Sequence, residues 1–187
     1  VYKRQILNLV PVMVAIWAAG LGWFVHFKLS TLAHRTNNSF AMTMETTRSA
    51  EFLKRQEIVS KHFPPGTQEI PQEYHAYFKG SALRDALSAN PKVQDDIHRA
   101  QAMHALKHML NFYEFMAVGI KMGDLDEELL YQTNCVQVVN LFTRAKSYVD
   151  YVVMDAPAGA GQPLAFCELK SLVERWRRRI QVETAKR

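Results

Sequence analysis

Four polar side chains between residues 104 and 114 are of types that can bind a metal ion or form a polar binding site. On a helix, His104 and His108 lie at i, i+4 on one face and could share a metal ion. Such a site needs a third strong ligand on the same face, and none lies nearby, so this pair is a weak metal candidate and no cofactor is predicted. Asn111 and Glu114 flank the apolar sector. We interpret them as a buried polar site partnered by Arg or Tyr side chains, with ligand binding or catalysis as the alternative.

Arg99 and His104 form an R-x4-H pattern. The pattern is similar to the motif of HEPN ribonucleases, which are small helical bundles that cut RNA at a paired site. On an ideal helix the two side chains point about 140° apart, so they would converge only across a bend or a partner chain. Arg55 and His62 give a second match at a permitted spacing, which shows how easily the pattern arises. Arg99 and His104 are therefore weak catalytic candidates.

The C-terminal segment is basic around Trp176. A cluster of this kind can contact anionic lipid head groups or RNA, although a solvated helix end is the commoner role. Nucleic acid is thus not a predicted partner but stays an alternative. The cluster comprises Arg175, Arg177, Arg178 and Arg179.

Helices must position all of these residues, because apolar residues recur at helical spacing and no strand-like alternation competes. The chain has 187 residues, of which 48% are hydrophobic, so it can bury a core. It has no Gly-rich phosphate loop, and its two cysteines lack metal-site spacing. We predict helices from Asn90-Pro91 to Gly123, from an Asp124/Glu127 capping pair through residue 152, and over residues 166–180.

The first apolar segment is long enough to cross a membrane. Residues 6–27 contain no charge, and as a helix they span about 33 Å, against a hydrocarbon core of about 30 Å. We interpret residues 1–28 as a retained transmembrane span, with a cleaved signal peptide as the alternative. Residues 1–5 (VYKRQ) resemble a translated sequencing adaptor and are expected not to be native.

The rest of the chain divides at its proline- and glycine-containing segments. We predict a helical stalk over residues 29–62, a linker with a short helix (72–88) over residues 63–90, and an antiparallel helical bundle over residues 91–187. Lys and Arg outnumber acidic residues just after the span, which places the bundle in the cytoplasm of a single-pass protein, in a bacterial inner membrane.

Small residues repeat within the span. Ala15 with Ala19, and Ala18 with Gly22, stand at i, i+4 and would let two spans approach closely, so a homo-oligomer through this face is expected. An oligomeric pore is a further alternative, because Asn8 and His26 could face a lumen.

The segment MLNFYEFMAVGIKMGDLDEELL, residues 109–130, carries a family resemblance. It resembles the signature of the domain-of-unknown-function family 4760, and PLAFCELKSLVERW, residues 163–176, resembles that family's closing helix. The resemblance implies a membrane-anchored helical domain, and the family has no established activity that could be transferred to this chain. We therefore expect an interaction or signalling module with an unknown protein partner, with a membrane-associated ribonuclease or defence effector as the alternative.

Overall fold

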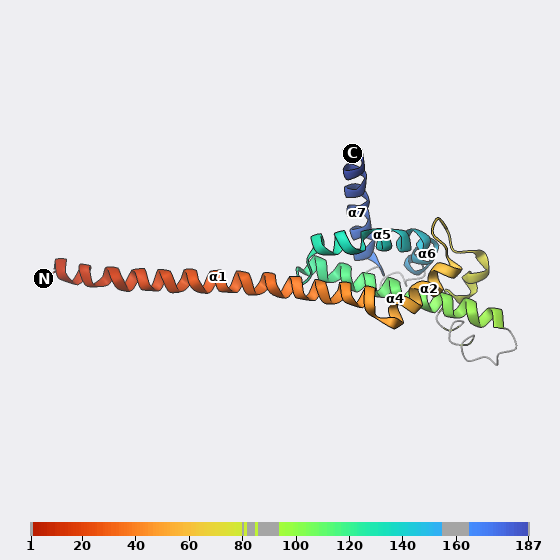
Figure 1. The fold of residues 1–187 in the computed structure, drawn as a ribbon, viewed down its shortest axis with the longest axis horizontal. Helices are drawn as coiled ribbons and strands as arrows, with labels where there is room; N and C mark the ends of the chain where they lie inside the picture. Colours follow the sequence, from red (N-terminus) through yellow and green to blue (C-terminus); the bar gives the residue numbers. More distant parts are fainter. Residues whose placement is uncertain (1, 80, 82–84, 86–93, 155–164, 187) are drawn as a thin grey trace.

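A computed structural model describes residues 2–79, 81, 85, 94–154 and 165–186, with the backbone alone for residues 2–12. These residues form helices and connecting turns without a strand, which confirms the all-α prediction (Figure 1). The elements are α1 (Tyr2–Arg48), α2 (Ala50–His62), the 3-10 helix η1 (Gln72–Tyr77), α4 (Gln94–Met122), α5 (Glu127–Arg144), α6 (Lys146–Met154) and α7 (Cys167–Ala185).

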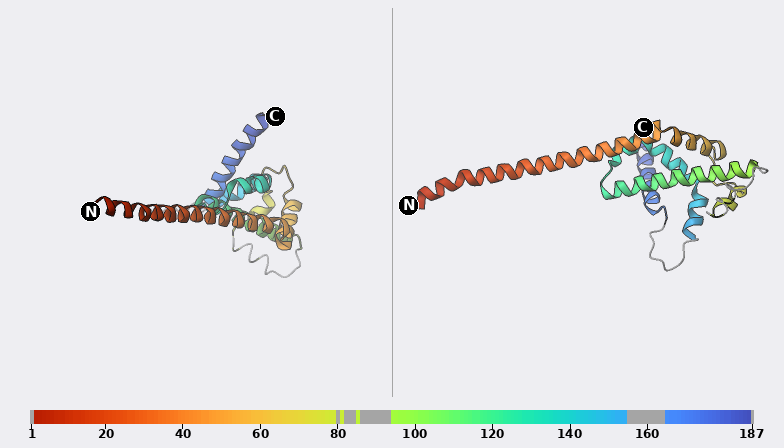
Figure 2. Two further views of the ribbon diagram at one scale, coloured as in Figure 1. Left: turned by 60° about the vertical axis from the view of Figure 1, so that its left-hand side comes forward. Right: turned by 90° about the horizontal axis from the view of Figure 1, so that it is seen from below.

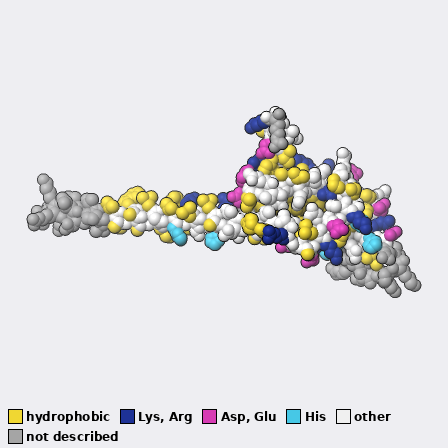
Figure 3. Space-filling view, in the orientation of Figure 1, with side chains coloured by type: hydrophobic (Ala, Val, Ile, Leu, Met, Phe, Trp, Pro, Cys, Tyr) yellow, Lys and Arg dark blue, Asp and Glu magenta, His cyan; other side chains and the backbone are white. Residues whose placement is uncertain are grey.

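Helix α1 extends far beyond the bundle (Figures 1 and 2). Its segment Met13–Arg48 is long and apolar enough to cross a membrane. The large apolar side chains from Met13 to Leu32 are exposed, with Trp17 and Trp23 at 67% and 70%. Figure 3 shows hydrophobic side chains along the projecting part of α1, whereas charged groups gather on the bundle. This exposed apolar surface is what a membrane-spanning helix presents to lipid.

The second half of α1 is attached to the bundle by a seam of small polar side chains. Ser39 Oγ accepts a hydrogen bond from the backbone N–H of Asp126 at 2.6 Å, and Ser39 is fully buried. Thr46 is buried against Asn134 of α5, with 3.2 Å between Thr46 Oγ1 and Asn134 Oδ1. Arg35 donates to the carbonyl of Leu125 at 3.3 Å. The apolar helix therefore continues without interruption into a part of α1 that the bundle holds.

Helix α4 is the centre of the core. The apolar stripe predicted for α4 is buried throughout. Helices α2 and α7 pack against α4. Helix α2, which is the second half of the expected stalk, adds Phe52 and Val59 to this core. The Phe52 ring meets the Phe112 and Tyr113 rings edge-on at 5.1 and 6.2 Å. The buried stripe comprises Met103, Leu106, Leu110, Tyr113, Ala117 and Ile120.

The turn between α4 and α5 makes these helices antiparallel. Gly123 adopts φ +81°, as expected of a glycine just after a helix, and the N–H groups of Asp124 and Leu125 bond to the carbonyl of Gly119. The predicted Asp124/Glu127 cap is wrong: α5 begins at Glu127, and Asp126 accepts the Leu129 N–H at 3.1 Å. Those two bonds to the Gly119 carbonyl hold Asp124 in the turn, which leaves Asp126 to cap α5.

Two further helix predictions need correction. The single helix predicted from 127 through 152 is two helices, because Ala145 has ψ near 2° and its N–H bonds to the carbonyls of Leu141 and Thr143. Of the short helix predicted over 72–88, the structure shows the 3-10 turn Gln72–Tyr77, which begins after Pro71. The remainder lies largely outside the described residues, as do Asn90 and Pro91.

Candidate functional site

The structure gives His104 and His108 an arginine neighbour from α2. Arg55 Nη1 donates to His108 Nδ1 at 3.1 Å and also pairs with Glu51, while the two histidine rings lie 5.4 Å apart. A cavity of about 280 Å³ lies between α2 and α4 beside His104. Burial, then the Arg55 charge, lowers the pKa of His108. Among the described residues no group of three or more His, Cys, Asp or Glu side chains could hold a metal ion.

Arg99 and His104 have different neighbours. Arg99 pairs with Asp96 one turn earlier, at 3.4 Å, and Asp96 also accepts a 2.8 Å hydrogen bond from Tyr77. His104 is exposed and faces His108. The second R-x-H match also separates, because Arg55 bonds to His108 and His62 to Tyr74. Among the described residues, neither R-x-H match therefore forms a hydrogen bond between its own Arg and His.

His62 makes the stability of the bundle dependent on pH. It is half-buried beside Tyr74, and burial, followed by the charges of Lys61 and His98, lowers its pKa below 6.5. The unfolded chain then takes up a proton at a higher pH than the folded chain does, so stability falls as pH decreases through about 6.5. We expect the thermal unfolding midpoint to fall between about pH 7 and pH 5.

A His62→Gln variant tests this prediction, because glutamine cannot titrate but can still hydrogen-bond. We expect a flatter profile of unfolding midpoint against pH for this variant. The matched control is His34→Gln, since His34 is exposed on α1. Equal profiles for His62→Gln and the unmodified chain would contradict the assignment.

Glu114 and Asn111 do not form a shared polar site. Asn111 is exposed, whereas the Glu114 carboxylate accepts the backbone N–H groups of Leu169 at 2.7 Å and Glu168 at 3.4 Å. The partners of Glu114 are therefore the free amides at the start of α7 and not the expected Arg or Tyr side chains. A carboxylate at a helix N-terminus also interacts favourably with the helix dipole. Glu114 thus joins α4 to the first turn of α7.

The four arginines of α7 fall into two groups. Arg175 pairs with Glu127, and Arg179 pairs with Glu128 and Glu183, which ties α7 to the start of α5. The Arg179 pairing and a bond from Gln132 lower the pKa of the Glu128 carboxyl to about 2. Arg177 instead bonds to the Thr143 hydroxyl, and Arg178 is exposed. Most of the predicted lipid or RNA cluster therefore contacts the bundle itself.

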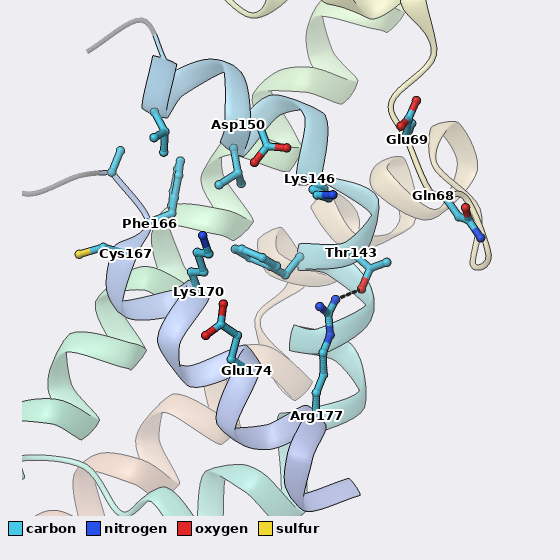
Figure 4. Close-up of a pocket in the computed structure, with 14 residues that line it drawn as sticks. Gln68, Glu69, Thr143, Lys146, Asp150, Phe166, Cys167, Lys170, Glu174 and Arg177 are labelled. Atoms are coloured by element: carbon cyan, nitrogen blue, oxygen red, sulfur yellow. Dashed lines mark hydrogen bonds between the residues drawn. The ribbon is translucent and has the colours of Figure 1, made fainter. Parts of the chain in front are cut away.

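A cavity lies where α7 crosses the bend between α5 and α6 (Figure 4). Its volume is about 530 Å³, within the range of small-molecule sites. Phe142, Val149 and Phe166, all buried, contribute apolar surface. Charged groups surround this surface: Glu69 from the segment before η1, Lys146 and Asp150 from α6, and Lys170, Glu174 and Arg177 from α7.

Sequence reasoning singled out Arg177 among these groups and missed the others. The spacing of Lys146, Val149, Asp150 and Val153 at i, i+3, i+4 and i+7 is the signal that one face of α6 carries both charge and apolar surface. Cys167 also lines this cavity. Both cysteines are free and half-buried, and burial raises the pKa of each thiol, which favours the protonated form.

Comparison with known proteins identifies the family that the sequence resembles. A family described as "Domain of unknown function (DUF4760)" matches residues 6–176, a range that includes the apolar half of α1 and all of the bundle up to Trp176. No curated protein and no solved structure matches the chain. Because the match covers most of the chain, from the apolar segment to α7, the protein belongs to the DUF4760 family.

Proposed function

We propose that the protein is a single-pass, membrane-anchored module that holds its helical bundle in a fixed position at the cytoplasmic face and acts through a protein partner. The observation that carries this proposal is the continuity of α1. One helix includes the exposed apolar segment and the polar seam, with no break before Ser49. A continuous helix transmits orientation, whereas a flexible linker would not.

The first contacts of the seam support a position of the bundle close to the proposed span. Between Lys28, the first charged residue after the apolar segment, and Arg35, which bonds to the Leu125 carbonyl, lie seven helical steps, or about 10 Å. The α4–α5 turn would then face the membrane, and α6 would lie at the far end of the bundle (Figure 1). The cavity beside α6 would be open to the aqueous phase.

Self-association is part of this proposal. Ala15, Ala19 and Gly22 are exposed on the projecting part of α1, and no atom lies within 4 Å of the position that a Cβ on Gly22 would take. Small residues at this spacing let two helices pack closely within lipid. A pair of chains would present two bundles side by side to the partner.

Deletion of residues 6–27 tests the anchor. We expect the full chain in the membrane fraction after alkaline carbonate extraction, and the deleted chain in the soluble fraction, because about 22 apolar residues are lost. The control replaces residues 6–27 with an unrelated transmembrane helix, which should restore membrane fractionation. If the deleted chain remained in the membrane, the bundle itself would bind lipid and the anchor proposal would be wrong.

A further inference from the structure

Arg177 lines the cavity between α6 and α7 and forms no ion pair with an acidic side chain among the described residues. Arg175 and Arg179, two residues to either side of Arg177 on the same helix, form ion pairs with glutamates of α5. Among the described residues, Arg177 donates to a neutral acceptor, the Thr143 hydroxyl, at 2.5 Å and forms no ion pair (Figure 4). A guanidinium without an acidic partner at the edge of a cavity can bind a carboxylate or a phosphate.

Thr143 holds this guanidinium in place. The Thr143 hydroxyl donates to the carbonyl of Val139 at 2.7 Å, so its oxygen lone pairs are directed toward Arg177. Thr143 lies in the last turn of α5, just before the bend at Ala145. The position of Arg177 is therefore set before any ligand arrives, which lowers the entropy cost of binding.

The remaining charges of the described lining are two lysines and three acids, one of which is Glu69, and all five side chains are exposed. Lys146 and Asp150 stand at i, i+4 on α6, and Lys170 and Glu174 stand at i, i+4 on α7. Neither pair forms an ion pair in the described structure, yet each lysine has an acid one turn away. Arg177, with Glu174 at i−3, is the half-buried charge of this lining, so its guanidinium is the group that a ligand carboxylate would meet with the least screening by water.

We propose that this cavity binds a water-soluble amphiphile with one negative charge. Its carboxylate would bind Arg177, and its apolar body would cover the Phe142 and Phe166 rings, which are buried at 8% and 6% exposure. A cavity of about 530 Å³ with an apolar floor and charged groups around it can hold both the apolar body and the head group of a ligand of this class. This inference concerns the cavity alone and does not depend on the proposed anchor.

Three probes with one apolar body and different head groups test the proposal: 4-phenylbutyrate, 4-phenylbutanamide and 4-phenylbutylamine. Ligand-observed NMR with the full chain in nanodiscs would give dissociation constants, which are expected in the millimolar range for ligands this small. We expect the carboxylate to bind more tightly than the amide, and the amine to bind most weakly. Failure of the carboxylate to bind, or equal or tighter binding of the amine, would overturn the proposal.

Two neighbouring arginines provide matched variants. Arg177→Gln should weaken 4-phenylbutyrate binding roughly tenfold, the effect of losing one charge-assisted hydrogen bond. Arg178→Gln removes the same charge from an exposed position outside the cavity and should change affinity less than about twofold. Equal effects of the two variants would show general charge attraction and overturn the assignment.

A further variant, Lys170→Gln, is used if Arg177→Gln fails to fold, because Lys170 is an exposed residue of the cavity. This variant must still weaken binding of 4-phenylbutyrate, and unchanged affinity would overturn the proposal.

Discussion

Trp176→Ala should reduce the free energy of unfolding of the bundle by about 3–5 kcal/mol. Trp176 is 1% exposed and lies in the middle of α7. Its indole N–H donates to Glu127 Oε1 at 3.0 Å, and its ring meets the Tyr131 ring edge-on at 5.6 Å. Alanine would leave a large cavity between α7 and α5 and would also remove a donor from the Glu127 carboxylate.

Trp176→Phe separates these two contributions. Phenylalanine keeps most of the buried apolar surface and the edge-on contact with Tyr131, but it cannot donate to Glu127. We expect Trp176→Phe to lose about 1–2 kcal/mol and thus less than half of the alanine effect. Urea unfolding of the full chain in detergent, followed by circular dichroism, measures both. Similar losses for the two variants would show that the hydrogen bond, and not packing, holds α7.

The helices were predictable from the sequence because their apolar spacing is regular. Met103, Leu106 and Leu110 recur at steps of three and four, and all are buried. Gly123 ends α4 as predicted, because only glycine adopts its φ of +81° without strain. Regular spacing alone did not reveal the bend at Ala145, since the apolar stripe continues in phase on both sides of it.

The candidate site was less predictable, because its residues meet only through the tertiary arrangement. Nothing local in the sequence relates Arg177 to Thr143, 34 positions earlier, and the bend at Ala145 brings α6 around the same cavity. Glu114 shows the same limit: a helical wheel placed it beside the apolar sector, but its partners are backbone amides of α7, which carry no sequence signature. From its side-chain type we expected Glu114 to pair with an Arg or Tyr side chain, but it accepts hydrogen bonds from the N-terminus of α7.

A single substitution in the polar seam that attaches α1 to the bundle should lower the stability of the bundle. Thr46 Oγ1 lies 3.2 Å from Asn134 Oδ1 and 2.9 Å from the Thr43 carbonyl, and Thr46 and Asn134 are both buried. Thr46→Leu removes the hydroxyl from beside the buried Asn134 oxygen and forces extra volume into the interface. We expect this variant to lose about 2–4 kcal/mol of bundle stability.

Thr47→Leu is the matched control, because Thr47 is the next residue, is exposed, and bonds only within α1. It should change stability by less than about 0.5 kcal/mol. Thr46→Val, which keeps the shape and removes the hydroxyl, should lose about 1 kcal/mol and so isolates the hydrogen bond from the volume effect.

The seam variants also test whether α1 fixes the bundle relative to the span. Spin labels at Ser30 and at Val136, an exposed residue of α5, report the distance between α1 and the bundle in vesicles. We expect a narrow distance distribution for the unmodified chain and for Thr47→Leu, and a broad one for Thr46→Leu. Without the Thr46 contact, α1 would change its angle to the bundle by rotation of the backbone at Ser49, between α1 and α2. A narrow distribution for Thr46→Leu would mean that Ser39 and Arg35, at the membrane-proximal end of the seam, hold α1 without Thr46. The same measurement on Ser39→Leu would then locate the contact that fixes the bundle.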